Sequence, residues 1–308
     1  MEQIDRVKER TKESPEAGQR IGKRVGDTGL KVARSVHNAV LSGGEPARNV
    51  ADVLHGSWLG HPLHPSLTDA TIGAWTMGAF FDAWGAATGD ERAHWAADRL
   101  TEVGVAAAVP TAMAGAADFS AVKKHAAATA TVHALLNAAA LGLMTTSVVQ
   151  RRRGRRAQGL LFSALGLGAN LFSAWLGGHL TYRDRVGVDH SERFAGPRQW
   201  KPVAQLADLP VGQARRVEVD GKGVLIYRDG GEVYAIGSVC SHAGGPLEEG
   251  EIRDCRVRCP WHDSVFDLRD GSVVHGPATR PQTAFEARLV GTRIEVRLPP
   301  GGSGGARL

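Results

Sequence analysis

Two short motifs decide the fold: Cys240-Ser241-His242 and Cys259-Pro260-Trp261-His262, with sixteen residues between His242 and Cys259. Cysteine thiolates and histidine imidazoles are the groups with which proteins hold iron or zinc. Two thiolates can bind one iron of a 2Fe–2S cluster while two neutral imidazoles bind the other. Each motif then gives one ligand to each iron, so the two loops must face each other. Zinc would accept the same four groups, although zinc fingers usually take both cysteines from one motif and both histidines from the other.

The pattern resembles that of the Rieske iron–sulfur domain, in which Cys-x-His is followed by Cys-x-x-His. The resemblance covers about residues 200–298. It implies a 2Fe–2S cluster with the cysteines on the inner iron and the histidines on the outer one: Cys240, Cys259, His242 and His262. Asp263 departs from the family, which usually has glycine after the second ligand histidine, and this leaves the path of that loop open. Val265-Phe266-Asp267, Asp270-Gly271 and Gly276-Pro277-Ala278 resemble the strand and the proline loop that close over the second motif in this family. Gly244, Gly245 and Pro246 follow the first motif and let backbone N–H groups approach the bridging sulfurs.

The sequence around the motifs predicts an all-β fold of antiparallel sheets with a cluster-binding loop subdomain. Apolar and polar residues alternate in short runs, and turn pairs such as Asp220-Gly221 and Asp229-Gly230 separate them. The predicted strands are Arg215–Val219, Gly223–Tyr227, Glu232–Ile236, Thr283–Leu289 and Arg293–Leu298.

The cysteine count indicates the subtype. Rieske proteins of the cytochrome bc complexes carry two more cysteines joined by a disulfide, and the matching positions here resemble Gly245 and Trp261. The third cysteine, Cys255, stands in a predicted strand, where we expect a buried, small apolar residue. With two of three cysteines bound to iron, no disulfide can form within the chain. The resemblance therefore implies the ferredoxin and oxygenase type, with a potential toward the low end of about −150 to +300 mV.

The remaining two thirds of the 308 residues require a second domain. The net charge of +5 does not indicate nucleic-acid binding, because acidic residues are interspersed with the basic ones. The densest basic run, Arg151–Arg156, separates two apolar segments, which is typical of the flank of a membrane span. We therefore expect a lipid membrane as a partner and no nucleic acid.

Four apolar segments predict an all-α four-helix transmembrane bundle. The third and fourth carry no formal charge, whereas the first contains Asp69 and Asp82 and the second contains Glu102 and Pro110. About 20 residues span the hydrocarbon layer, and a central charge costs about 2.5–3.5 kcal/mol on insertion scales. A soluble alanine-rich bundle is the alternative. The segments are Leu67–Thr88, Leu100–Ala117, Ala126–Gln150 and Ala157–Leu180.

Residues 58–188 also resemble an uncharacterised bacterial family of four-helix membrane domains. The resemblance rests on His61-Pro62-Leu63-His64-Pro65 and on the glycine-rich stretch Gly177–Arg183. With an even number of spans, several histidines would meet on the face nearest the Rieske domain. A haem, a metal or a quinone site would fit there, and simple caps or anchors of helix ends are the alternative. The candidate residues are His61, His64, His133 and His179.

The predicted order is a basic arm over 1–57, a membrane domain over 58–180, a flexible linker over 181–199, the Rieske domain over 200–298 and a glycine-rich tail over 299–308. The arm is either an interfacial amphipathic helix or a solvated, partly disordered segment. We expect a multi-pass protein of the inner membrane. The arginine run favours a cytoplasmic position for its own loop, which would place the Rieske domain on the opposite side of the membrane. The long arm without a signal sequence and the lysines at 123–124 favour a cytoplasmic Rieske domain instead, and we expect this orientation.

These features predict a membrane-tethered one-electron carrier between a reductase or ferredoxin-type donor and a membrane or soluble acceptor. An oxygenase would need a catalytic domain with a mononuclear iron, and we expect none in this chain. Two other functions stay open. The chain could be a ferredoxin-like component that feeds electrons to an oxygenase system, or a redox sensor with a purely structural membrane anchor.

Overall fold

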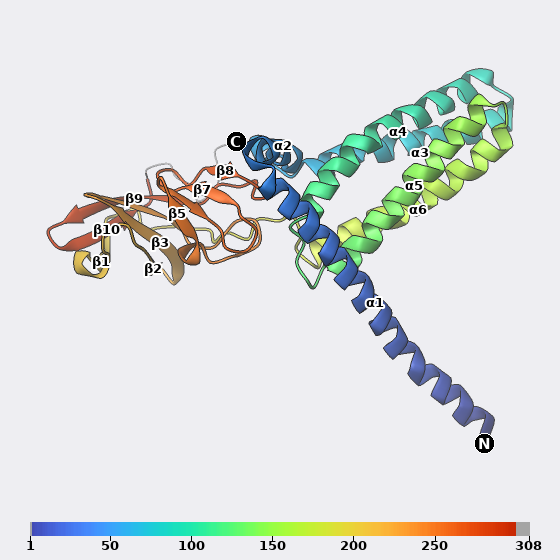
Figure 1. Cartoon of the computed structure of the whole chain (residues 1–308). Coiled ribbons are helices and arrows are strands. Elements are labelled where there is room, and N and C mark those ends of the chain that lie inside the picture. Colours follow the sequence, from blue (N-terminus) through green and yellow to red (C-terminus); the bar gives the residue numbers. More distant parts are fainter. Residues whose placement is uncertain (1, 300–308) are drawn as a thin grey trace. The chain divides into compact units, whose positions relative to one another are not determined.

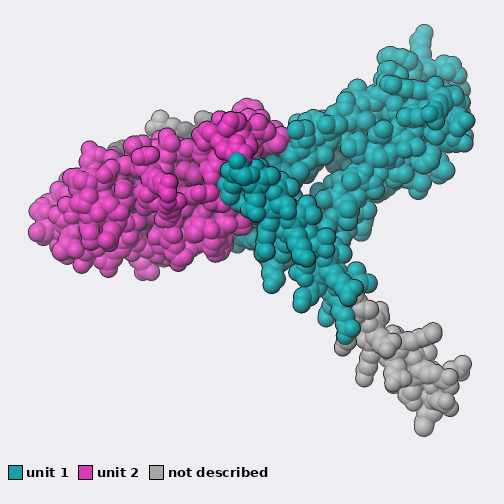
Figure 2. All heavy atoms as spheres, in the orientation of Figure 1, with its two compact units in different colours: residues 1–42, 64–186 teal, residues 43–63, 187–308 magenta. Residues whose placement is uncertain are grey.

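The computed structural model describes the backbone of residues 2–299 and the side chains of residues 18–299 (Figure 1). The predicted glycine-rich tail therefore lies outside the described residues from position 300 onward. The chain divides into two compact units, coloured separately in Figure 2. We name residues 1–42 and 64–186 the helical unit, and residues 43–63 and 187–308 the sheet unit.

All four predicted apolar segments form helices in the helical unit. They are α3 (Leu63–Thr88), α4 (Glu91–Phe119), α5 (Ala127–Arg152) and α6 (Arg156–Tyr182). Asp90 starts α4 by accepting a hydrogen bond from the Arg92 N–H at 2.8 Å. Among the described residues, α4, α5 and α6 are long and apolar enough to cross a membrane. The count by this measure is three, one fewer than the four spans predicted.

Helix α3 nevertheless runs antiparallel along the length of α4. At one end the His94 ring lies against Gly85, and further along the Trp75 ring fills the space left by Gly104. The hydroxyls of Thr71 and Thr111 lie 3.2 Å apart. With a rise of about 1.5 Å per residue, α3 and α4 are both about 40 Å long. Helix α3 therefore packs beside α4 over most of its length.

The N-terminal arm forms a long helix, α1 (Glu2–Ser42), and its small residues contact α5. Gly26 faces Ala128 and Gly29 faces Thr131, while Ala33 is fully enclosed in the same apolar cluster. Since glycine and alanine let two helix backbones approach closely, this part of α1 is a packed helix. The alternative of a solvated, disordered arm is wrong for these residues.

The sheet unit holds two antiparallel sheets, which confirms the predicted fold class. The first has the strand order β1-β10-β9-β4-β3-β2, and the second has the order β5-β6-β7-β8. The first contains β1 (Lys201–Gln205), β2 (Ala214–Val219), β3 (Lys222–Asp229), β4 (Glu232–Gly237), β9 (Ala284–Val290) and β10 (Arg293–Arg297). The second contains β5 (Glu251–Arg253), β6 (Arg256–Arg258), β7 (Val265–Asp267) and β8 (Val273–His275).

The five predicted strands correspond to β2, β3, β4, β9 and β10, each within about a residue or two at its ends. The small sheet is inserted between β4 and β9. It shares one apolar core with Cys240 and Cys259, so the ligand loops rest on a rigid base.

The expected strand position of Cys255 is wrong. Asp254 and Cys255 form the two-residue turn between β5 and β6, with φ angles of 51° and 57°. Two left-handed residues are what a tight hairpin of this kind requires. Cys255 is buried, as expected, and its thiol donates a hydrogen bond to Asp229 at 3.1 Å. Burial and the neighbouring Asp229 raise the pKa of this thiol.

The predicted flexible linker is folded over its second half. Phe194 is buried and contacts Phe285 edge to face, with ring centroids 4.9 Å apart. The His190 N–H donates to the Ser241 carbonyl at 2.8 Å, and Glu192 accepts from the Gly223 N–H at 2.8 Å. Because Phe194 joins the core of the large sheet, residues 190–194 belong to the sheet unit and not to a free coil.

Candidate iron–sulfur centre

The first ligand loop, residues 238–246, follows β4 and closes on itself. The Cys240 N–H donates to the Gly245 carbonyl and the Gly244 N–H donates to the Cys240 carbonyl, both at 2.8 Å. Gly244 has a φ of 80°, which a residue with a side chain rarely adopts. The loop encloses the Cys240 side chain completely and leaves His242 half-buried.

The second ligand loop, residues 259–264, follows β6 and closes in the same way. The Cys259 N–H donates to the Ser264 carbonyl at 2.8 Å, and the Asp263 N–H donates to the Cys259 carbonyl at 3.1 Å. Asp263 has a left-handed φ of 62° and forms an ion pair with Arg258 at 2.5 Å. Aspartate tolerates this conformation better than most residues do. The loop therefore closes with Asp263 in the position where the resembling family has glycine.

The two loops bring the four predicted ligands together in two pairs. The Cys240 and Cys259 thiols share a hydrogen bond and are both buried. The His242 and His262 rings lie at the half-buried edge, with centroids 5.0 Å apart and nearly perpendicular planes. A side-chain carbon at Gly245 would lie 2.8 Å from the Cys259 sulfur, so only glycine fits beside it.

Backbone N–H groups converge on both sulfurs. Those of His242 and Ala243 reach the Cys240 sulfur, and those of Trp261 and His262 reach the Cys259 sulfur. The hydrogen bond between the thiols raises the pKa of Cys240, to which burial adds. The same bond lowers the pKa of Cys259 to about 7, and the N–H groups assist. Donors aimed at sulfur stabilise thiolate ligands and bridging sulfides, so the donor set and its surroundings fit a 2Fe–2S cluster.

A third loop, residues 275–280, links the two ligand loops. The Ser241 hydroxyl donates to the Arg280 carbonyl at 2.6 Å, and the Ala278 N–H donates to the Ser264 hydroxyl at 3.0 Å. The Gln282 amide can donate to the Val239 carbonyl at 3.1 Å and accept from the Ser241 N–H at 2.8 Å. Leu247 is fully buried with the cysteines, while Pro246 and Pro277 are half-buried.

A segment far away in the sequence supports this third loop. Helix α2 (Gly44–His55) and the short helix η1 (Ser57–Leu59) lie beside β8 (Figure 1). The Asp52 carboxylate accepts from His275 Nδ1 at 2.8 Å and from the Gly276 N–H at 2.7 Å. The Ser57 hydroxyl donates to the Ala278 carbonyl at 3.1 Å. Sequence reasoning missed this contact, because no motif marks Asp52 as the partner of a loop 223 residues away.

No group of three or more histidine, cysteine, aspartate or glutamate side chains suited to one metal ion occurs within residues 18–299. A Rieske cluster has only two protein ligands on each iron, so it requires two pairs of side chains and no group of three.

The four predicted membrane histidines have different partners. His64 and His133 come together, with ring centroids 6.2 Å apart. His61 belongs to the sheet unit and contacts its neighbouring carbonyl at Pro62, and His179 contacts Arg183 at 3.2 Å.

Both close imidazoles are anchored through the same ring nitrogen. His64 Nδ1 lies 2.9 Å from the Thr111 carbonyl and His133 Nδ1 lies 2.8 Å from the Ser173 carbonyl. Carbonyl oxygens only accept, so Nδ1 carries the proton in each ring and Nε2 offers a lone pair. The Asn137 amide donates to His133 Nε2 at 3.1 Å.

The opposite end of the helical unit holds a buried ion-pair cluster that sequence reasoning missed. Arg151 binds Asp82 at 2.5 Å and Asp98 at 2.8 Å, and Arg156 binds the same two carboxylates. The side chains of Arg151 and Asp82 are only 3% and 8% exposed. The arginine run was predicted as a membrane flank, but two of its members turn inward and join all four helices.

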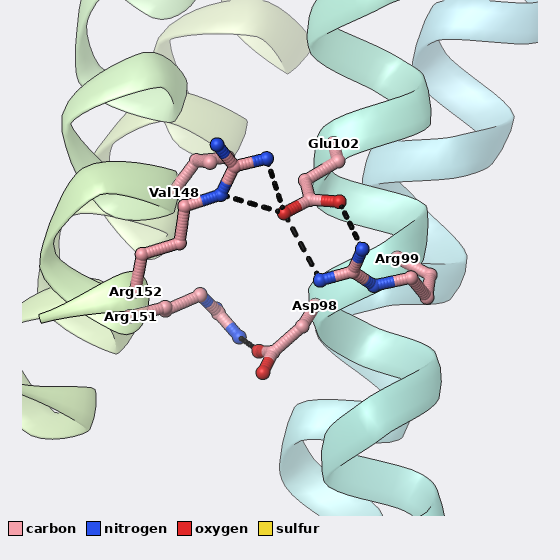
Figure 3. A pocket seen from close by; sticks show the side chains of 6 residues that line it. All are labelled: Asp98, Arg99, Glu102, Val148, Arg151 and Arg152. Carbon is pink, nitrogen blue, oxygen red and sulfur yellow. Dashed lines mark hydrogen bonds and ion pairs between the residues drawn. The ribbon is translucent and has the colours of Figure 1, made fainter. Parts of the chain in front are cut away.

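A pocket of about 100 Å³ lies beside this cluster, between α4 and α5 (Figure 3). Ion pairs cross it, with Glu102 between Arg99 and Arg152 (Figure 3). Most of the side chains that line the pocket form ion pairs, so the pocket is better suited to holding α4 and α5 together than to binding an apolar ligand.

Comparison with known proteins agrees with this arrangement. Residues 199–287 match the family described as Rieske [2Fe-2S] domain, and residues 60–190 match the family described as predicted membrane protein (DUF2231). The 3-phenylpropionate/cinnamic acid dioxygenase ferredoxin subunit of Escherichia coli (strain K12) is 36% identical over 95 residues, which are 30% of this chain and 89% of that protein.

Apoptosis-inducing factor 3 of Homo sapiens is 36% identical over 121 residues, or 39% of this chain, but the chain spans only 20% of that protein's length. Among solved structures, the ferredoxin of carbazole 1,9a-dioxygenase from Nocardioides aromaticivorans IC177 is 36% identical. It matches 32% of this chain and 96% of its own, with a TM-score of 0.31. The identity of 36% to the ferredoxin subunit over 89% of its length shows that the chain belongs to the Rieske [2Fe–2S] proteins, and a DUF2231 predicted membrane protein domain precedes its Rieske domain.

Proposed function

We propose that this protein is a membrane-tethered Rieske electron carrier that passes single electrons from a soluble reductase to an acceptor protein or membrane centre. The observation that carries the proposal is the pairing of two buried thiols with two half-buried imidazoles, in a domain that matches 89% of a ferredoxin subunit. Bound there, a 2Fe–2S cluster supplies a reversible one-electron couple.

The residues of the three loops would have different roles in holding the cluster. Cys240 and Cys259 hold the inner iron, and the backbone N–H groups around them stabilise sulfur charge. His242 and His262 hold the outer iron at the half-buried edge, where a partner protein can approach. The third loop and Leu247 keep water from the inner side. The donor is a reductase or a ferredoxin-type protein, and an oxygenase system is one class of acceptor.

The tether is the helical unit, inserted in the inner membrane with all four helices across the bilayer. Exposed aromatic side chains at both ends support this. Trp84 and Trp95 lie where α3 passes into α4, and Trp175 and Tyr182 lie at the other end of the bundle. Tryptophan and tyrosine concentrate at both membrane–water interfaces.

The Rieske domain faces the cytoplasm in this proposal. Arg151 and Arg156 are neutralised by Asp82 and Asp98, so the arginine run carries less free positive charge than its sequence suggests. The arginine run is therefore a weaker signal for a cytoplasmic loop, and the lysines at 123–124 count for more in setting the orientation. The test is digestion of the Rieske domain by an added protease in inverted vesicles and its protection in intact spheroplasts.

A second redox centre completes the proposal. His64 and His133 present two imidazoles within one helical bundle, and a haem or a quinone is the cofactor that two such groups can hold. A metal ion is the third candidate ligand for the membrane histidines, of which His61 contacts the Pro62 carbonyl and His179 contacts Arg183.

The cluster assignment is tested with the detergent-purified full chain. We expect oxidised and dithionite-reduced absorption spectra and a reduced-state EPR spectrum of Rieske type. Cys259→Ala should abolish both, whereas Cys255→Ala, which removes the cysteine outside the centre, should leave them intact. A Cys259→Ala protein that keeps the wild-type EPR spectrum would exclude Cys259 as a ligand.

A further inference from the structure

The side of α2 and η1 that points away from the Rieske loops is apolar and uncovered. Val50, Val53, Trp58 and Leu59 leave 57%, 55%, 67% and 48% of their surface exposed. At about 100° per residue, Val50 lies roughly opposite Asp52, whose carboxylate is bound to the third loop, and Val53 lies one turn beyond Val50. The segment is therefore amphipathic: its polar side binds the third loop of the Rieske domain, and its apolar side is exposed.

Trp58 is held on this apolar side. Its indole N–H donates to the Val53 carbonyl at 3.2 Å, so the polar atom of the ring is satisfied within the segment. The acidic side chains of α2, Glu45 and Asp52, turn the other way and meet His275. The exposed patch consequently carries no charge, and its largest member is the side chain that most favours a membrane–water interface.

Chain connectivity places this patch next to the proposed membrane span. Leu59 precedes Leu63, the first residue of α3, by four residues, which can reach at most about 14 Å. The same end of the helical bundle carries the exposed rings of Trp175 and Tyr182. A lipid surface at that end of the bundle is therefore within this short reach of Leu59 along the chain.

We propose that Val50, Val53, Trp58 and Leu59 insert into the lipid headgroup region, and that α2 thereby holds the third loop of the Rieske domain at the membrane surface. The inference rests on the proposed membrane tether. One side of the segment binds lipid, while Asp52 and Ser57 on the other side bind residues 275–278. The cluster loops are joined to that third loop, so they stay close to the bilayer whatever the linker does.

The test uses nitroxide spin labels on the full chain in lipid nanodiscs, with Cys255 changed to Ala and the cluster kept oxidised. Labels are attached at Trp58→Cys and separately at Val53→Cys, which retains Trp58. Leu165→Cys on α6 is the lipid-exposed reference, and Val211→Cys in the sheet unit is the water-exposed reference. Power saturation measures collisions with oxygen, which enriches in lipid, and with a nickel chelate, which stays in water.

We expect positions 53 and 58 to collide with oxygen several-fold more than position 211 and to be shielded from nickel. A water-like result at 53 and 58, with position 165 in lipid, overturns this inference and leaves the tether standing. Low collision rates with both reagents at 53 and 58 mean that a protein partner or a second copy covers the patch, which also overturns it. A water-like result at position 165 overturns the tether itself and this inference with it.

Discussion

Asp263 shows how one residue can depart from a family pattern without loss of the loop. Its backbone takes the left-handed conformation that favours glycine, and its carboxylate pairs with Arg258 beside the cluster loop. The hydrogen bond with Cys240 lowers the pKa of the Cys259 thiol, and the negative charge of Asp263 opposes that shift. The residue therefore has an electrostatic effect that glycine would lack.

This gives a prediction for the cluster potential. Reduction adds a negative charge to the cluster, and a nearby carboxylate opposes it, so removing that carboxylate should raise the potential by on the order of tens of millivolts. Asp263→Asn and Asp263→Gly should both show the rise in an EPR-monitored redox titration. Asp208→Asn, an exposed acid on η2 (Leu206–Asp208), is the control for general charge. A potential that moves in the glycine variant alone would mean that the backbone, and not the charge, sets it.

At the scale of elements, the contact of α2 with the third loop predicts a local stability effect. Asp52→Ala leaves His275 Nδ1 and the Gly276 N–H without their shared acceptor, which costs about 1–3 kcal/mol for a buried donor. We expect faster amide exchange in residues 275–279 by mass spectrometry. Asn49→Ala, an exposed position on the same helix, should leave that exchange unchanged. Equal exchange in the Asp52→Ala protein and the wild type would show that the loop holds itself.

Some strands and site residues could be predicted from the sequence, and others could not. Alternation and turn pairs located β2, β3, β4, β9 and β10, because each strand is long enough to bury a face of its own. The hairpin of β5 and β6 was predicted as one strand through Cys255, and β1 and β8 were not predicted, since such short runs show no clear period. Cys240, His242, Cys259 and His262 could be proposed because ligand type and spacing carry the chemistry. Asp52 could not, since its role comes from a tertiary contact with no local signal.

At the scale of the whole molecule, the buried ion pairs decide how the helical bundle holds together. A lone Asp82 in the first apolar segment is costly in a membrane, and Arg151 from the fifth helix removes that cost by pairing with it. Arg151→Met leaves the buried Asp82 carboxylate with only Arg156, whose side chain is 32% exposed, and should destabilise the bundle by up to about 3–5 kcal/mol in thermal unfolding followed by circular dichroism. Arg153→Met changes an exposed neighbour and should be silent.

A double variant distinguishes the loss of charge pairing from the loss of packing. Arg151→Met with Asp82→Leu removes both charges and should recover most of the loss, because an apolar pair of similar size costs little in the same place. In each variant the Rieske spectrum should persist, since the cluster ligands lie in the other unit. A double variant as unstable as Arg151→Met alone would point to lost packing and not to an unpaired charge.

A cofactor at His64 and His133 would give the helical unit a redox centre of its own, to which the Rieske cluster could pass electrons. His64 Nε2 offers a lone pair inside the bundle, while His133 Nε2 accepts a hydrogen bond from Asn137 that a bound cofactor would have to replace. The full chain in mild detergent should then take up more than one electron per 2Fe–2S cluster. A haem would give a Soret band and a pyridine haemochrome, and a quinone would appear in an organic extract. His64→Leu should lose that second centre and keep the cluster signal, whereas His179→Leu, whose ring contacts Arg183, should keep both. A wild-type chain that accepts one electron per cluster and yields neither haem nor quinone refutes the relay, and the helical unit is then an anchor for the Rieske domain alone.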